Sequence, residues 1–311
     1  MARSNKSLTW INLWTVYLIW GSTYFAIAVA VKSMPSLLAM GIRFTAAGII
    51  LAVVLLVKSG AKALLVPRKE IFSASAMGAV LLGFGIGNVS LAEHTVPSGV
   101  VALIISAMPF WIALFRALTG DHPAKLSWIG VIFGFVGVAI LLKPGQVHSM
   151  NHASNSKLLF WMIMVLIGNI CWAYGTFISP KLSLPKNALV LTTYEMFAGG
   201  LGLLLAALIS GERFSSLSTA RASSWWALLY LVLVGSIIAY SAYLWLVGNA
   251  PVSLTSTYAY VNPVIAVFLG SLFLHEKMSP SIFIGGAIVV AGVVMVISAE
   301  SRVKSTQIVP E

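Results

Sequence analysis

Long apolar stretches follow one another along the whole chain, and they constrain its fold more than any other feature. Of the 311 residues, 59% are hydrophobic and 9% are charged, whereas a soluble domain carries about 25% charged residues. About 20 apolar residues span a hydrocarbon core of about 30 Å as a helix. Ten stretches approach or reach this length: 10–31, 35–57, 71–92, 97–118, 126–142, 157–179, 188–209, 225–247, 251–273 and 280–298. The sequence therefore predicts an all-α polytopic membrane protein with ten transmembrane helices.

The first five and the last five stretches form an internal sequence repeat. The residue pairs that keep their spacing are Trp20–Arg43 and Trp172–Glu195, at 23 residues, and Pro97–Pro109 and Pro251–Pro263, at 12 residues. Because five is odd, the second copy enters the membrane from the opposite face, and inverted repeats of this kind build alternating-access carriers. We predict two inverted five-helix repeats at 1–142 and 157–298, a linker at 143–156 and a polar cytoplasmic tail at 299–311.

The basic residues lie at the ends of the apolar stretches, although the formal net charge is +11. They form no single patch, so nucleic acid is not an expected partner, whereas the lipid bilayer is. With a cytoplasmic N-terminus, twelve Lys and Arg residues fall inside and six outside. This distribution satisfies the positive-inside rule and predicts a multi-pass protein of the inner or plasma membrane with both termini in the cytoplasm.

Several motifs resemble the drug/metabolite transporter superfamily, specifically its EamA-like ten-helix family. They are WGSTYF at 20–25, VPSGVVALIISAMPFWIALF at 96–115 and STYAYVNPVIAVFLGSLFLHEKMS at 256–279, followed by the glycine-rich IGGAIVVAGVVMVI. The resemblance covers 10–298 and implies a ten-helix inverted-repeat fold and export or exchange of small polar metabolites by a secondary carrier. One departure is Glu93-His94, where members of the family usually carry an apolar or aromatic residue near position 93.

Two ionisable residues, Arg43 and Glu195, fall well inside predicted helices. At 1.5 Å rise per residue, Arg43 lies about 12 Å from the outer end of its helix and Glu195 about 11 Å from the inner end of its own. Intramembrane charges are costly and mark functional sites, so Arg43 is a candidate for docking an anionic group and Glu195 for binding a proton or amine. The alternative is a buried structural ion pair, or an arginine hydrogen-bonded to backbone carbonyls.

The last candidates are polar, aromatic and proline residues inside the predicted helices. Tyr258 and Asn262 are four residues apart and share a helix face. Pro109 and Pro263 are predicted to kink their helices near the bilayer midplane, where carriers place their sites. The other predicted cavity-lining residues are Trp20, Tyr24, Asn88, Trp172, Tyr174, Tyr240 and Tyr243. Interhelical hydrogen bonds and interfacial anchoring are the competing explanations, although Trp20 and Trp172 lie about halfway along their stretches.

Taken together, these features favour a secondary-active exporter or exchanger of amino acids or related small metabolites, working by alternating access. The sequence has no G-x-x-x-x-G-K-[ST] loop for ATP and no metal-ligand cluster, so we expect no enzyme activity, cofactor or metal. Glycines at 130, 134, 137, 285, 286 and 292 favour close helix packing and also allow a homodimer. Two alternatives stay open: a membrane-embedded lipid-modifying enzyme that uses Glu93-His94, and a passive channel or facilitator of the same fold.

Overall fold

The computed structural model describes residues 6–120, 123–143, 147–250, 255, 257–277 and 279–306, and Pro251 lies outside them. These residues form helices, and no strand occurs among them. The α-helices are α1 (Lys6–Val31), α2 (Ser36–Ser59), α3 (Arg68–Gly78), α4 (Gly87–Ala92), α5 (Ser98–Ile105), α6 (Met108–Leu118), α7 (Lys125–Leu142), α8 (Asn155–Ile178), α9 (Ala188–Ile209), α10 (Ala222–Tyr230), α11 (Ala239–Asn249), α13 (Tyr258–Leu274) and α14 (Pro280–Thr306). Short 3₁₀ helices are η1 (Ala61–Leu64), η3 (Ser179–Lys181) and η4 (Phe214–Thr219), and π-helical segments are η2 (Ala79–Ile86) and η5 (Leu231–Ile238).

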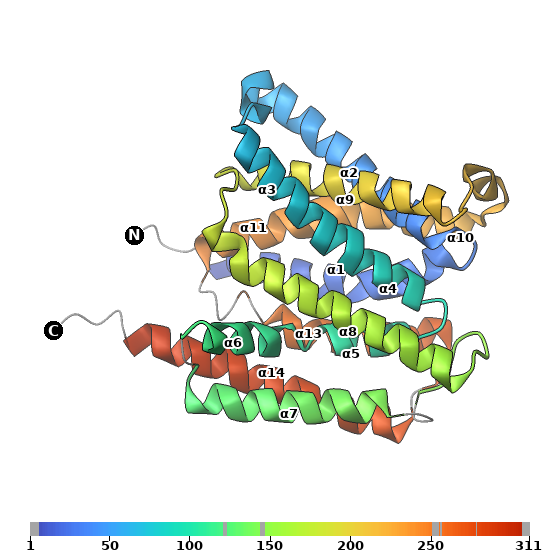
Figure 1. Ribbon diagram of the computed structural model, residues 1–311, viewed down its shortest axis with the longest axis vertical. Coiled ribbons are helices and arrows are strands. Elements are labelled where there is room, and N and C mark those ends of the chain that lie inside the picture. The colour runs from blue at the N-terminus through green and yellow to red at the C-terminus, as the bar shows by residue number, and fades with distance from the viewer. Residues whose placement is uncertain are drawn as a thin grey trace. The chain divides into compact units, whose positions relative to one another are not determined.

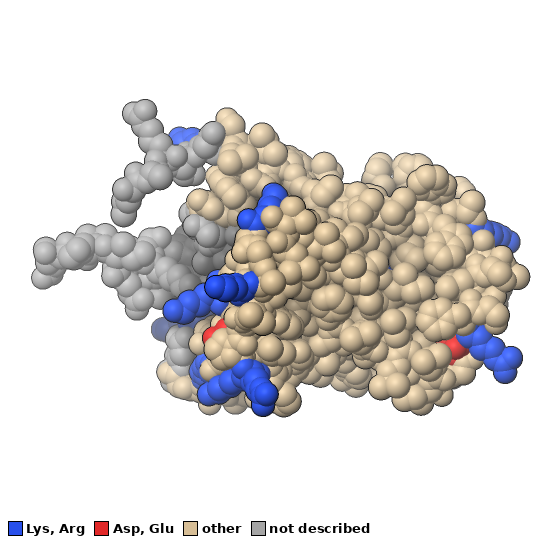
Figure 2. All heavy atoms as spheres, turned by 90° about the horizontal axis from the view of Figure 1, so that it is seen from above, with Lys and Arg blue, Asp and Glu red and all other residues tan. Residues whose placement is uncertain are grey.

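Nine helical runs among the described residues are long and apolar enough to cross a membrane. The predicted stretch at 251–273 is described as the shorter helix α13, and α14 extends to Thr306, beyond the predicted end of its stretch at 298. Most of the surface on the face shown in Figure 2 carries no charged side chain. The prediction of an all-α polytopic membrane protein is confirmed.

The helices form two compact units, and each unit draws on both halves of the sequence. Unit 1 comprises Met1–Phe25, Thr95–Phe177 and Ala242–Glu311. Unit 2 comprises Ala26–His94 and Ile178–Ser241. Compact packing therefore does not follow the two sequence copies.

Unit 1 contains a helix pair, α7 and α14, that run side by side (Figure 1). A Cβ atom added to Gly130 would lie 2.7 Å from the carbonyl oxygen of Gly292, and one added to Gly137 would lie 2.8 Å from that of Gly285. Only glycine permits this backbone approach. The predicted packing glycines are thus used for helix packing inside unit 1.

Unit 2 is built around the pair α2 and α9, which lie along each other (Figure 1). Gly41 faces Leu204 and Gly48 faces Phe197, so the two helices run antiparallel. A step of seven residues forward on α2 corresponds to seven residues back on α9.

Helix irregularities occur at equivalent positions of the two copies. The π-helical segments η2 and η5 begin at Ala79 and Leu231, 152 residues apart, which is also the separation of Trp20 and Trp172. Their helical turns are wider than α-helical turns, and such segments are frequent at functional sites. Both belong to unit 2.

The two predicted kink prolines differ in their structural settings. Pro109 occupies the first turn of α6, after α5 has ended at Ile105, so its missing N–H costs no helix hydrogen bond. Pro263 lies inside α13, where the missing donor interrupts the hydrogen-bond ladder. The first copy therefore carries a broken helix here, and the second a helix with an internal proline.

Two glutamates in turns cap helix N-termini. Glu276 accepts hydrogen bonds from Ser98 N at 2.8 Å, Ser98 Oγ at 2.7 Å and Gly99 N at 3.2 Å. Glu212 accepts from Leu38 N at 2.8 Å and Leu37 N at 3.3 Å. Free N–H groups and the helix dipole stabilise a carboxylate at these positions, so both side chains have a structural role.

Candidate functional site

Three aromatic rings from different helices meet in unit 1. The ring centroids of Trp20 on α1 and Tyr243 on α11 are 5.1 Å apart, and those of Trp20 and Tyr258 on α13 are 5.2 Å apart in an edge-to-face arrangement. Tyr243 and Tyr258 also meet edge-to-face at 5.9 Å. The structure thus brings together three of the residues predicted to line a cavity; we call them the aromatic cluster.

Hydrogen-bonding groups border the aromatic cluster on α1 and α13. The hydroxyl groups of Tyr17 and Thr257 are hydrogen-bonded to each other. With its amide nitrogen oriented toward them, buried Asn262 donates to the carbonyl oxygens of Tyr17 at 3.2 Å and Tyr258 at 3.3 Å. These groups supply hydroxyl, amide and carbonyl functions beside π faces, a combination suited to binding a small polar solute.

Close approach of α1 to α13 depends on the residue after Trp20. A Cβ atom added to Gly21 would lie 2.8 Å from Cβ of Ile265 and 3.3 Å from the carbonyl oxygen of Asn262. The W-G pair of the WGSTYF motif therefore places a ring and a close backbone contact at adjacent positions. The local sequence builds one wall of the cluster.

A second polar contact in unit 1 lies at the break between α5 and α6. Asn169 on α8 is buried, and its amide nitrogen donates to the carbonyl oxygen of Ile104 at 3.0 Å. A helix that ends inside the bilayer leaves carbonyl groups that protein side chains must satisfy. The amide oxygen of Asn169 has no hydrogen-bond partner among the described residues.

Arg43 in unit 2 is buried, and its partners come from three elements. Its Nε donates to Ser236 Oγ in η5 at 3.1 Å, and Glu93 and Tyr230 interact with it electrostatically. Its guanidinium carbon also lies 4.8 Å from the ring centroid of Phe44. Glu93 is equally buried, so the departure from the family pattern at this position provides the arginine with an acidic neighbour.

Glu195 in unit 2 is also buried, but it is not the partner of Arg43. Its Oε2 accepts a hydrogen bond from Tyr240 Oη at 3.5 Å. In the register of α2 and α9, Arg43 lies opposite Gly202. Gly202 is seven residues from Glu195, or about 10 Å along the helix axis. Arg43 and Glu195 therefore do not form an ion pair with each other. Arg43 contacts Ser236, and Glu195 contacts Tyr240.

The remaining predicted site residues lie apart from these contacts or have other surroundings. Asn88 is buried on α4, and its Nδ2 has no hydrogen-bond partner among the described residues. Tyr24 is half-buried on α1, one helical turn after Trp20. Tyr174 is 51% exposed and packs edge-to-face on Phe115 at 5.5 Å. Trp172 is half-buried on α8 and makes no ring contact with the aromatic cluster within the part of the chain that the structure describes.

The acid–histidine pair at 93–94 bears on the enzyme alternative. His94 Nε2 lies 2.7 Å from Ser36 Oγ, a distance that a serine–base pair requires. However, the Ser36 hydroxyl donates to the carbonyl oxygen of Ser90 at 3.1 Å and is 1% exposed. The Ser90 carbonyl oxygen and His94 Nε2 therefore compete for the single hydroxyl hydrogen, at a position that is buried from solvent. The described residues also contain no cluster of three metal-ligating side chains.

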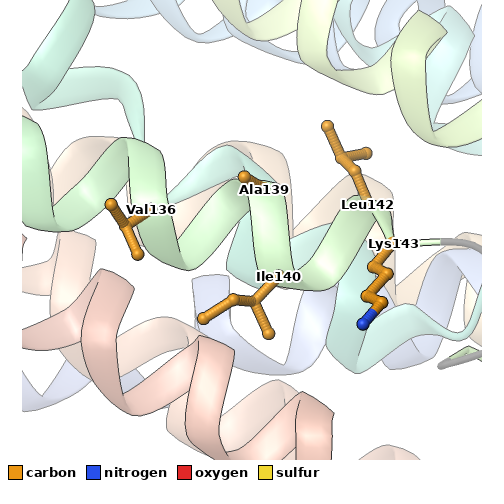
Figure 3. A pocket seen from close by; sticks show the side chains of 5 residues that line it. All are labelled: Val136, Ala139, Ile140, Leu142 and Lys143. Atoms are coloured by element: carbon orange, nitrogen blue, oxygen red, sulfur yellow. The ribbon is translucent and has the colours of Figure 1, made fainter.

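A shallow pocket on unit 1 contains none of the predicted site residues. It lies along the end of α7 and is lined by Val136, Ala139, Ile140, Leu142 and Lys143 (Figure 3). The lining is almost wholly apolar, and four of the five side chains are hydrocarbon. The aromatic cluster of unit 1 and, separately, Glu195 of unit 2 are therefore stronger candidates for function than this pocket.

Three residues that contribute to these contacts were not among the predicted site residues. They are Tyr17, Asn169 and Ser236. Helical spacing signals two of them, because Tyr17 precedes Trp20 by three residues and Ser236 precedes Tyr240 by four. No comparable signal marks Asn169, whose role depends on a helix break in another part of the chain.

Known proteins resemble this chain over nearly its full length. An inner membrane transporter of uncharacterized function from Escherichia coli (strain K12), YedA, is 38% identical over 285 residues, covering 91% of this chain and 89% of its own. Protein PecM of Dickeya dadantii is 28% identical over 297 residues, 93% of each chain. A protein of known crystal structure shares the fold with a TM-score of 0.65, over 94% of this chain and 99% of its own, at 18% identity.

A family model matches this chain twice. The model of the EamA-like transporter family matches residues 9–143 and again residues 159–298. The names of the family and of the relatives indicate a transporter of small molecules rather than an enzyme. With these matches and its many apolar helices, the chain is a multi-pass membrane protein that belongs to the EamA-like transporter family of the drug/metabolite transporter superfamily.

Proposed function

We propose that the protein is a secondary-active carrier that exports or exchanges amino acids or related small metabolites by alternating access. The observation that carries this proposal is the aromatic cluster beside the polar groups of Tyr17, Thr257 and Asn262. The π faces attract an ammonium group, while hydroxyl and amide groups can orient a polar solute. Both termini are placed in the cytoplasm on the distribution of Lys and Arg.

The rings are in contact with one another in this structure, so a solute must displace at least one of them to reach the centre. Tyr258 follows directly after Thr257, the residue before α13 begins, and Tyr243 lies near the middle of α11. We infer that entry of a solute separates Tyr258 from Trp20, since residues near a helix start move with less disruption than residues within a helix. This separation would link occupancy to a change of conformation, as alternating access requires.

Transport by purified protein in liposomes tests the proposal. Liposomes loaded with an unlabelled mixture of L-amino acids are expected to accumulate the labelled mixture by counterflow, and the rate is expected to saturate with concentration. Liposomes without protein serve as the control. A rate that rises linearly without saturation would support a passive facilitator, and no movement of amino acids would overturn the proposed substrate class.

Replacing Trp20 by alanine is expected to reduce counterflow strongly. A desolvated cation–π contact contributes about 2 kcal/mol, which corresponds to about a thirtyfold loss of affinity. Trp20→Phe retains a ring and is expected to be intermediate. The matched control is Trp10→Ala on the same helix, because Trp10 is 53% exposed and should leave the rate unchanged. Equal rates in Trp20→Ala and Trp10→Ala would exclude the cluster as the site.

A further inference from the structure

Two side chains of unit 2, Ser236 and Tyr240, contact the two buried charges from one helical run. The continuous helical run of α10, η5 and α11 carries Ser236, which accepts from Arg43 at 3.1 Å, and Tyr240, which donates to Glu195 at 3.5 Å. Residues four apart lie on the same helix face. Arg43 and Glu195 are therefore connected through one turn of this helix, although they do not contact each other directly.

Fewer hydrogen bonds stabilise the charge of Glu195 than stabilise the two glutamates that cap helix N-termini. Glu276 accepts three hydrogen bonds and Glu212 accepts two backbone N–H groups. Glu195 accepts one long hydrogen bond, from Tyr240, within the described residues. Burial disfavours a charged carboxylate unless donors or opposite charges compensate.

The elements packed against α9 bring no opposite charge to Glu195. On α2, Arg43 and Lys58 are displaced from the position opposite Glu195 by about 10 Å and about 12 Å along the helix axis. The titratable residues of α3 are confined to its first turn, and η2 has none. The helix that contains η5 presents Tyr230 and Tyr240. The titratable residues on these elements are Arg43, Lys58, Arg68, Lys69, Glu70, Tyr230 and Tyr240, and Tyr240 contacts the carboxylate.

We propose that Glu195 is a proton-binding site that couples transport to the proton gradient, and that Tyr240 transmits its charge state to α11. This proposal rests on the proposed function: the proton is the ion that would drive the carrier. Proton uptake converts the carboxylate into a carboxylic acid, and no other bond is made or broken. The ionised form accepts a hydrogen bond from the Tyr240 hydroxyl, whereas the neutral form can donate one to it, so the direction of this hydrogen bond reports the bound proton.

The surroundings of Glu195 are suited to converting this change into movement. Its main chain lies against Gly78, where an added Cβ atom would be 2.5 Å from the Cα atom of Glu195, and η2 begins directly after Gly78. Its side chain contacts α11 directly after η5 ends. Glu195 therefore adjoins one π-helical segment of each copy. Because π-helical segments are frequent at functional sites, we expect these two segments to respond to the change.

Infrared spectroscopy of the purified protein tests proton binding without any substrate. A protonated carboxyl group shows a C=O stretching band that the carboxylate lacks, and its intensity is followed as a function of pH. We expect Glu195→Gln to remove one titrating band and Tyr240→Phe to shift that band, because the hydrogen bond is lost. Glu70→Gln, in the first turn of α3, should not remove the Glu195 band. Identical spectra for wild type and Glu195→Gln would overturn the proposal, and Tyr240→Phe decides the question if Glu195→Gln does not fold.

Proteoliposomes then test coupling, with the labelled L-amino acid mixture as the probe. The readout is the ratio of transport rates with and without a proton gradient. This ratio should be several-fold in wild type and in Glu70→Gln, and close to one in Glu195→Gln, whatever the absolute rates. A ratio that stays several-fold in Glu195→Gln would overturn the proton site and leave the carrier intact. Absence of any transport in wild type would instead overturn the proposed substrate class, while the infrared result still decides the proton site.

Discussion

Replacing Gly78 by alanine is expected to destabilise unit 2 more than a glycine-to-alanine substitution at any other described position of that unit. The added Cβ atom would lie 2.5 Å from Cα and 2.6 Å from the carbonyl carbon of Glu195. Main-chain atoms of a packed helix cannot move aside as a flexible side chain can, so α3 and α9 must separate. Overpacking typically costs 1–3 kcal/mol, and for a contact with main-chain atoms we expect about 3 kcal/mol or more. Thermal unfolding in detergent measures the loss.

Gly83 offers a matched control for this substitution, because it lies five residues further along the same helical run. An alanine Cβ at Gly83 would have its nearest neighbours at 3.9 Å, an ordinary van der Waals distance. Removing a glycine from a helix stabilises it by about 0.5–1 kcal/mol, so Gly83→Ala should be neutral or slightly stabilising. Equal unfolding temperatures for Gly78→Ala and Gly83→Ala would show that α3 does not approach α9 as closely as the structure has it.

Replacing Arg43 by methionine should also destabilise the protein strongly, because the change leaves a buried acid without its counter-charge. Arg43 and Glu93 are both buried and interact electrostatically. Burial disfavours a charge that has lost its neighbouring opposite charge, so we expect a loss of about 3 kcal/mol, the lower end of the cost of breaking a direct buried ion pair. Methionine approximates the length of the arginine side chain and limits the effect of lost volume. Chemical or thermal unfolding in detergent provides the measurement.

A double-mutant cycle separates the lost pair from other effects of this change. Arg43→Met combined with Glu93→Gln removes both charges and should cost clearly less than Arg43→Met alone. Ser236→Ala removes one hydrogen bond acceptor, and we expect a smaller loss of about 1–3 kcal/mol. If the double variant is as unstable as the sum of its parts, Glu93 does not compensate the charge of Arg43.

The helical membrane fold was predictable from sequence because it depends on local composition. A stretch of about 20 apolar residues is specified by its own side chains, whatever lies beside it. The π-helical segments could not be predicted in this way. The residues of η2 and η5 are as apolar as their surroundings, and only the equivalent glycines Gly83 and Gly235 hinted that the two helices share an irregularity.

The candidate site was predictable as a set of residues but not as a set of contacts. Mid-span aromatic residues identified Trp20, and polar spacing identified Tyr258 and Asn262. Their meeting with Tyr243 depends on how α1, α11 and α13 pack. Arg43 and Glu195 were recognised as unusual, yet their separation along the helix axes depends on the register of α2 and α9, which no local signal specifies.

The sequence by itself determined that the chain is an all-α membrane protein with a doubled pattern, since hydrophobic length and residue spacing are properties of the chain alone. The tertiary structure decided which helices form one compact unit, and both units combine segments of the two copies. It also decided that Arg43 interacts with Glu93 and Ser236, and Glu195 with Tyr240. The physical reason is that glycine contacts such as those of Gly41 and Gly78 fix the helix registers, and a register shift of one turn moves a side chain by about 5 Å.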